Sequence, residues 1–263
     1  TNPFSNCYCT PSGPGSSYYL SAMSATGLTA FSVTAAAPPS GGYMDRSSTD
    51  TVSQYLGSNV NFNLTVANGA DGGMAIWVDF NQNGSFADAG EKVYNSGAYL
   101  TGASGTFSVP VTAALGNTKM RIGFNWSSTS PTECGPGNTY TDYEDFTFKV
   151  LMSCVSLPTA PVDASPFCQS ATPTDLTWSA VSGADSYTVF LSAPNAPTLD
   201  SVATVATLNY TTAAPLATGV YQWMIVLKNS TGAASGCNVF TFTVDTLPTI
   251  AVSSTPASGI VCL

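Results

Sequence analysis

Apolar and polar residues alternate in short runs along much of this chain. The clearest runs place the following residues on one face each: Val60, Phe62, Leu64 and Val66; Ile76, Val78 and Phe80; Phe107, Val109 and Val111; Met120, Ile122, Phe124 and Trp126; Phe146, Phe148 and Val150. A repeat of two residues is typical of a β-strand with one buried face. No stretch of a dozen residues shows an apolar repeat of 3.6, so the pattern predicts an all-β protein.

The alternating runs fall into two units separated by a proline-containing segment. Gly, Asn and Pro turns between regular strands predict a β-sandwich, jelly-roll-like, over residues 1–152. Ser156–Pro161 contains two prolines, which resist regular strand pairing, and is predicted to be a short, stiff linker. A second β-sandwich is expected over 153–247. Residues 248–263 read as the start of a further β domain that is incomplete.

The second unit carries several residues at characteristic places. Trp178 occupies a core strand, Tyr221 follows Gly219 where a tyrosine corner would lie, and a turn spans Asn229–Gly232. This arrangement resembles a fibronectin type III domain, with the immunoglobulin-like sandwich fold that the family implies. Domains of that kind serve mostly as spacers, so the resemblance by itself says little about chemistry.

Composition narrows the possible functions. Only 8% of residues are charged, against about 25% in an average soluble protein, yet 44% are hydrophobic, which argues against disorder. The net charge of −9 leaves no basic surface for phosphates, so nucleic acid is not expected as a partner. No apolar run is long enough to span a bilayer, so we expect no membrane insertion. The chain has no histidine, which removes the commonest general base, and we expect no enzymatic activity.

The cysteines indicate an oxidising compartment. The seven are Cys7, Cys9, Cys134, Cys154, Cys168, Cys237 and Cys262, and none forms a CxxC motif. In a chain with so little charge, disulfides and an extracellular or cell-surface location are the natural interpretation. We expect Cys168 to pair with Cys237 and close the second unit. Cys134 is expected to pair with either Cys7 or Cys9.

A loop with oxygen-bearing side chains at alternate positions follows the strand that ends near Val78. The candidate metal ligands are Asp79, Asn81, Asn83, Ser85, Asp88 and Glu91. Alternating Asp and Asn before a glycine turn, here Gly84, is how short loops supply oxygen ligands to Ca²⁺. The match to a helix-flanked calcium loop is partial, because the twelfth position is Gly90 and the acid comes one residue later. The pattern predicts a Ca²⁺ site, with a purely structural Asx-rich turn as the alternative.

Acidic residues gather in a second segment as well. Glu133, Asp142, Glu144 and Asp145 lie within residues 133–145. Clustered carboxylates repel one another unless a cation or a basic side chain offsets the charge. The segment therefore suggests either a second calcium site or ion pairs, in which Arg121 pairs with Glu144 or Asp145.

Several motifs together resemble the GEVED domain family. They are Cys9–Pro11, Gly42–Asp45, Trp77–Gly84, Lys119–Ile122, Cys134–Gly135 and the signature-like Tyr140–Phe146. The signature is loose, because Thr141 replaces glycine, Asp142 replaces glutamate and Phe146 replaces tyrosine. The resemblance implies a module of large secreted or surface proteins of Bacteroidota-like bacteria, found beside fibronectin-type domains and sometimes beside peptidases. It implies no catalytic residue.

These observations favour a non-catalytic structural or adhesive segment of a large secreted, cell-surface bacterial protein, an adhesin or a filament. Its expected partners are the other domains of the same long chain, with surface glycans or proteins as further partners. The alternative is an accessory carbohydrate- or protein-binding module of a secreted hydrolase. A third, weaker interpretation makes the first unit a lectin, with exposed tyrosines such as Tyr18 or Tyr99 stacking on sugar rings.

Overall fold

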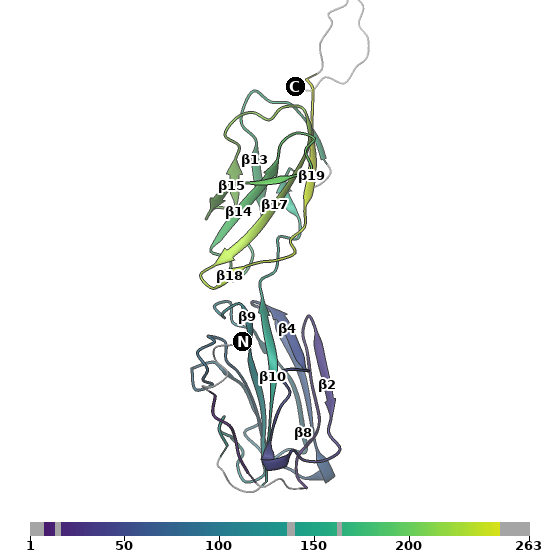
Figure 1. Cartoon of the computed structure of the whole chain (residues 1–263), viewed down its shortest axis with the longest axis vertical. Helices are drawn as coiled ribbons and strands as arrows, with labels where there is room; N and C mark the ends of the chain where they lie inside the picture. The colour runs from purple at the N-terminus through teal and green to yellow at the C-terminus, as the bar shows by residue number, and fades with distance from the viewer. Residues whose placement is uncertain (1–7, 14–16, 136–139, 162–164, 248–263) are drawn as a thin grey trace, which may run out of the picture. The chain divides into compact units, whose positions relative to one another are not determined.

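A computed structural model describes residues 8–13, 17–135, 140–161 and 165–247 (Figure 1). The chain divides into two compact units, Thr1–Leu151 and Met152–Leu263. Regular structure in the described residues consists of β-strands and two 3-10 turns, at Ser40–Gly42 and Ala67–Gly69. The prediction of an all-β chain is therefore confirmed. None of the described residues form a helix long and apolar enough to cross a membrane. The predicted further domain at 248–263 lies outside the described residues.

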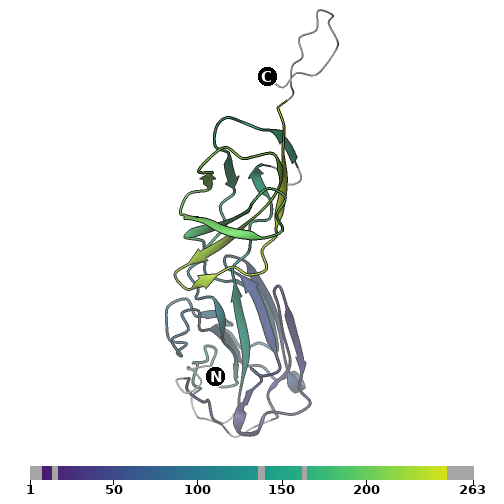
Figure 2. The same cartoon turned by 45° about the horizontal axis from the view of Figure 1, so that its top comes forward.

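The first unit is a sandwich of a four-stranded and a six-stranded sheet. The smaller sheet has the order β2 (Ala30–Thr34), β1 (Leu20–Thr26), β5 (Asn59–Val66), β8 (Gly102–Ser108). The larger has the order β3 (Tyr43–Asp45), β10 (Thr141–Leu151), β9 (Gly116–Asn125), β6 (Gly73–Val78), β7 (Lys92–Asn95), and β4 (Thr51–Tyr55) also pairs with β10. β10 is antiparallel to β9 but parallel to β3 and β4. In Figures 1 and 2, β10 (teal) runs beside β4 (blue).

The core between these sheets follows the predicted alternation. Every second residue of β5, from Val60 to Val66, is buried. Phe146 of β10 stacks on Phe31 of β2, with ring centroids 4.2 Å apart. The prediction is wrong for Val111 and Trp126, which are 48% and 44% exposed. Both lie just beyond the ends of their strands, where alternation no longer aims a side chain at the core.

The outer face of the six-stranded sheet is covered too, so β6 is buried at every residue. A second hydrophobic cluster covers this face. It includes Trp77 of β6, Phe86 of the loop after β6 and Tyr143 of β10, and Tyr8 packs against it. Gly123 of β9 leaves the space that these rings occupy, since a Cβ there would lie 2.5 Å from Tyr143 Cε1. The loop after β6 and the N-terminal segment are thus parts of the packed structure.

The second unit consists of a three-stranded and a six-stranded sheet. The smaller has the order β11 (Pro158–Ala160), β13 (Asp175–Trp178), β16 (Asn209–Thr211). The larger has the order β12 (Ser165–Cys168), β19 (Phe240–Asp245), β17 (Gly219–Asn229), β14 (Ser186–Ser192), β15 (Leu199–Val205), with β18 (Gly232–Ala233) on β17. β12 runs parallel to β19. The predicted linker at Ser156–Pro161 is therefore partly wrong, because β11 pairs with β13 there.

Aromatic side chains fill the core of the second unit. Trp178 lies 5.5 Å from Tyr187 between ring centroids, and Tyr221 stacks on Phe242 at 5.2 Å. The Tyr221 hydroxyl donates a hydrogen bond to the Ala217 carbonyl oxygen at 3.0 Å. This bond to a backbone group four residues upstream is the tyrosine corner that the sequence predicted.

Two disulfides join four of the five described cysteines, as Cys9–Cys134 and Cys154–Cys237. The first is one of the two predicted pairings for Cys134. The predicted Cys168–Cys237 bond is wrong, because the register of β12 on β19 sets Cys168 opposite Asp245, at the other end of β19 from Cys237. Cys7 and Cys262 lie outside the described residues. Within the described residues, each unit thus contains one disulfide.

Candidate cation loop and the acidic strand

All six predicted calcium ligands lie in the loop between β6 and β7. Its first half is a series of Asx turns. The Asn83 N–H donates to Asn81 Oδ1 at 3.0 Å, and the Ser85 N–H donates to Asn83 Oδ1 at 2.9 Å. The series ends where the Ala87 N–H donates to Ser85 Oγ at 3.1 Å. Each alternate oxygen thus accepts from the backbone two residues on, which is the local reason for the sequence pattern.

Asp79 is the centre of the loop. Its side chain is fully buried, and its Oδ2 accepts hydrogen bonds from the Gly84 N–H at 2.9 Å and from the Tyr8 hydroxyl. Oδ1 accepts from the Asn83 N–H at 3.2 Å. Gly84 has a φ of +84°, a conformation that glycine adopts without strain. Burial, followed by the bond to Asp79, raises the pKa of Tyr8, so its hydroxyl stays a donor to the carboxylate.

Glu91 closes the loop and lacks a full set of hydrogen bonds. Its side chain is buried; Oε1 accepts a long bond of 3.4 Å from the Asn81 N–H, and Oε2 has no hydrogen-bond partner. Burial, with smaller contributions from the charges of Asp79 and Asp88, raises the pKa of Glu91 to about 7. A buried carboxylate oxygen without a partner costs free energy, and a cation would remove that cost.

A shallow hollow of about 190 Å³ lies next to Glu91, and its lining includes Asn81 and Asp88. Asp88 also accepts a hydrogen bond from Asn83 Nδ2 at 2.8 Å. Within the described part of the chain, no three His, Cys, Asp or Glu side chains are grouped so as to hold a metal ion. A cation in this loop would therefore need amide, hydroxyl or backbone oxygens beside its carboxylates, all of which are ligands that Ca²⁺ accepts.

The acids of β10 divide between the two faces of its sheet. On the outer face, Asp145 receives bonds from Arg121 Nε and Nη2 at 2.6 and 2.9 Å. It also accepts from Lys119 Nζ at 2.9 Å and from the Tyr43 hydroxyl at 2.8 Å. Arg121 lies with its guanidinium carbon 5.0 Å from the ring centroid of Phe86. The predicted ion pair of Arg121 is therefore made with Asp145, one of the two expected partners.

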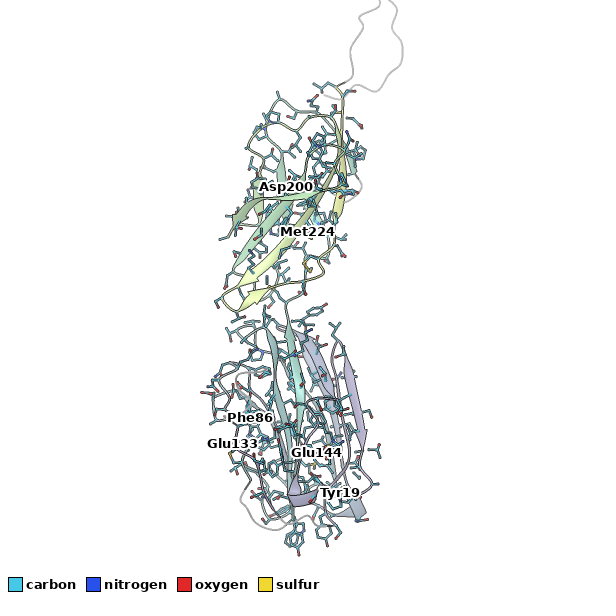
Figure 3. All side chains as sticks on the ribbon, viewed as in Figure 1. Tyr19, Phe86, Glu133, Glu144, Asp200 and Met224 are labelled. Carbon is cyan, nitrogen blue, oxygen red and sulfur yellow. A yellow bond between two sulfur atoms is a disulfide. The ribbon has the colours of Figure 1, made fainter. Side chains whose placement is uncertain are left out.

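On the inner face, Asp142 and Glu144 are both fully buried. Glu144 pairs with Arg46, while Asp142 Oδ2 accepts from the Leu20 N–H of the opposite sheet at 2.8 Å. Asp142 Oδ1 has no hydrogen-bond partner. Burial, and then the charge of Glu144, raises the pKa of Asp142 to about 8. Glu144 is labelled in Figure 3.

A second small hollow lies beside the Cys9–Cys134 disulfide. Its lining includes Phe86 and Glu133, which are also labelled in Figure 3.

An aromatic cluster lies at one end of the first unit, where sequence analysis expected no cluster. The ring of Trp126 lies 5.4 Å from that of Tyr140 and 6.3 Å from that of Tyr18, between centroids. Trp126 is 44% exposed and Tyr140 37% exposed. Two partners of buried acids were not predicted from the sequence: Tyr8, which bonds to Asp79, and Arg46, which pairs with Glu144. The position of Tyr8 next to Cys9 could have indicated this role, because the disulfide of Cys9 with Cys134 holds the N-terminal segment against the first unit.

Comparisons with known proteins found a family match and several similar solved structures. Residues 73–149, which run from β6 nearly to the end of β10, match the GEVED domain family. No curated protein matches the chain. Among solved structures, the chain is similar to FN3tt, with 21% identity over 36% of this chain and 97% of that one, and a TM-score of 0.27. It is also similar to Clostridium thermocellum CbhA fibronectin(III)-like modules, with 11% identity over 79% of this chain and 97% of that one, and a TM-score of 0.27.

A further similar structure comprises the FN1–FN3 domains of chicken CNTN1, with 13% identity, coverage of 74% of this chain and 64% of that one, and a TM-score of 0.32. The sandwich assignment of the second unit stands on its own strand pairings and on its tyrosine corner. For the first unit, the family match covers the loop, Arg121 and the acidic strand, which carried part of the resemblance in the sequence. The motifs at Cys9–Pro11 and Gly42–Asp45 lie outside the matched residues. The part of the first unit from residue 73 to residue 149 therefore matches the GEVED domain family.

Proposed function

We propose that this chain is a non-catalytic structural segment of a large secreted, modular surface protein of the adhesin or filament type. The observation that carries the proposal is the pair of disulfides, one in each β-sandwich. Disulfides form and persist in oxidising compartments, outside the cytosol. Two further features support a non-catalytic role: the sequence has no histidine, and the acids of β10 are engaged in ion pairs or buried. Antibodies to this segment should label intact producing cells; labelling only after permeabilisation would reject the surface location.

Calcium binding by the loop at 79–91 is part of this proposal. The support is the series of turns from Asn81 to Ala87 together with the buried, unpaired Oε2 of Glu91. A bound cation would fix the loop against β6 and stiffen the unit. Because the pKa of Glu91 is raised to about 7, calcium would have to displace a proton at lower pH, so its affinity should fall as the pH drops below 7.

Calcium is expected to stabilise the first unit through Glu91. At ten to a hundred times the dissociation constant, ligand binding should add about 1.4–2.7 kcal/mol, a shift of a few degrees in melting temperature. In Glu91→Gln the shift should disappear, while stability in chelator should be equal to or above that of the native protein, because a buried charge is gone. Calorimetry at pH 8 with calcium or with chelator makes the comparison.

The matched control is Asp71→Asn, which removes an exposed acid of the same unit outside the loop and should keep the full calcium response. A native melting temperature that is identical with calcium and with chelator would reject the cation site. A response that persists unchanged in Glu91→Gln would place the ion elsewhere.

The aromatic cluster of Tyr18, Trp126 and Tyr140 favours a second candidate, an accessory module that binds carbohydrate. Exposed aromatic faces supply apolar stacking surface, and a polar rim would complete a sugar site. If this candidate is right, the protein binds selected sugars on a glycan array, and Trp126→Ala loses that binding. Tyr99→Ala, which removes another exposed ring of the same unit, should bind as before. An array without signal for the native chain would reject the candidate.

A further inference from the structure

The two disulfides occupy equivalent places in their units. In the first unit, Cys9 precedes the first described strand, β1, and Cys134 lies shortly before the last strand, β10. In the second unit, Cys154 follows the boundary at Met152, and Cys237 lies shortly before the last strand, β19. Each bond therefore connects the start of a unit directly to the approach of its final strand.

This arrangement fixes the covalent path that tension would follow. When the chain is pulled from a point before Cys9 and a point after Asp245, the tension passes through the first disulfide to Cys134 and continues along β10. It then reaches Cys154, crosses the second disulfide to Cys237 and leaves along β19. The residues between the paired cysteines, which are 125 and 83 positions apart, form closed loops off this path. They carry no tension while the disulfides are intact.

The two strands on the path are suited to bear load. Both are already extended, so pulling at their two ends lengthens them little. β10 lies between β9 on one side and β3 and β4 on the other, and its inner-face residues Phe146 and Phe148 are fully buried. β19 likewise lies between β12 and β17. Tension that enters one end of such a strand and leaves the other stretches the strand and does not peel its neighbours away.

We infer that the chain is a force-bearing segment in which β10 and β19 are the only described strands on the path of tension, and the disulfides shield the other described strands of each sandwich from it. The inference deepens the proposed function and rests on it for the source of the force. The shielding itself follows from the connectivity alone. One consequence is that the loop at 79–91, which lies between Cys9 and Cys134, keeps its shape while the chain is under load.

Single-molecule pulling tests the inference on the whole chain, with handles before Cys9 and after Asp245. The oxidised protein should show no extension step from either closed loop. After reduction, the first unit should release about 410–450 Å and the second about 270–300 Å, at 3.3–3.6 Å for each residue between the paired cysteines. The double variant Cys154→Ser with Cys237→Ser should show only the shorter release in oxidising buffer. If that variant does not fold, reduction of the folded native chain gives the same comparison.

A handle moved to the exposed Asp71 provides the control, because it lies inside the first closed loop. Pulling between Asp71 and the C-terminal handle should unfold the first unit even when it is oxidised, which shows that shielding and not unusual stability suppresses the step. A full-length release in the oxidised protein pulled end to end would overturn the inference. Failure of surface labelling with shielding intact would instead remove the proposed function and leave the mechanical property in place.

Discussion

Replacing Arg121 by methionine is expected to destabilise the first unit by about 3–5 kcal/mol. Arg121 is almost fully buried, and its guanidinium donates two hydrogen bonds to Asp145 and one to the Glu133 carbonyl oxygen. Without it, the buried carboxylate of Asp145 keeps only Lys119 and Tyr43 as partners. Breaking a buried pair on one side leaves a charge that is poorly compensated, and this accounts for the size of the effect. Denaturant unfolding with hydrogen exchange read on peptides of the first unit measures it.

The control for Arg121 is Lys149→Met, which removes a basic side chain at an exposed position of β10. It should change stability by no more than about 0.5 kcal/mol. Replacing Arg121 and Asp145 together by apolar residues should recover part of the loss, since no buried charge then stands alone. An Arg121→Met protein as stable as the Lys149→Met control would contradict the role given to the ion pair.

Asp142 is expected to make the first unit less stable as the pH rises. Its pKa is raised to about 8 in the folded protein, above the ordinary value of 3.8. The folded state therefore holds a proton that the unfolded chain releases. The resulting stabilisation is complete below about pH 4 and is lost as the pH rises through 8. One pKa unit corresponds to about 1.4 kcal/mol, so the loss across this window amounts to several kcal/mol.

Asp142→Asn should remove most of that dependence, because the amide oxygen can still accept from the Leu20 N–H and no group at this position titrates. Urea unfolding of both proteins at pH 5 and pH 8 shows whether the difference shrinks. Glu91 and Glu144, whose pKa values are also raised by burial, should leave a residual slope. Asp71→Asn should retain the native slope. A slope unchanged in Asp142→Asn would mean that the titrating group lies elsewhere.

Strands such as β5 and β17 could be predicted from the sequence because each has one buried face. In β5, Val60, Phe62, Leu64 and Val66 repeat with a period of two and all are buried. The alternation misled only past the strand ends, at Val111 and Trp126, because a period does not mark where pairing stops. The tyrosine corner at Tyr221 was also predictable, since local spacing determines it.

The parts that sequence analysis could not give depend on register between distant segments. Pairing of Cys237 with Cys154 in place of Cys168 follows from the parallel register of β12 on β19, which leaves no mark in local sequence. The partners of the β10 acids also depend on strand register. Asp145 and Glu144 lie on opposite faces of the sheet, where Asp145 pairs with Arg121 and Glu144 pairs with Arg46. For the loop, the alternating side-chain oxygens could be predicted from the residue order. The hydrogen bond from the Tyr8 hydroxyl to Asp79 could not be predicted, because the two residues are 71 positions apart in the sequence.

The position of β10 also governs when the first unit can form during synthesis. This strand is the last of its unit, yet it lies inside the larger sheet and provides the pairing of both β3 and β4. Until Thr141–Leu151 emerge, the nascent chain has exposed strand edges that invite wrong association. If the chain is secreted, as proposed above, it is best kept unfolded until it has left the cell. It would then close in one step there, once its final strand and the oxidant for Cys9 and Cys134 are both present.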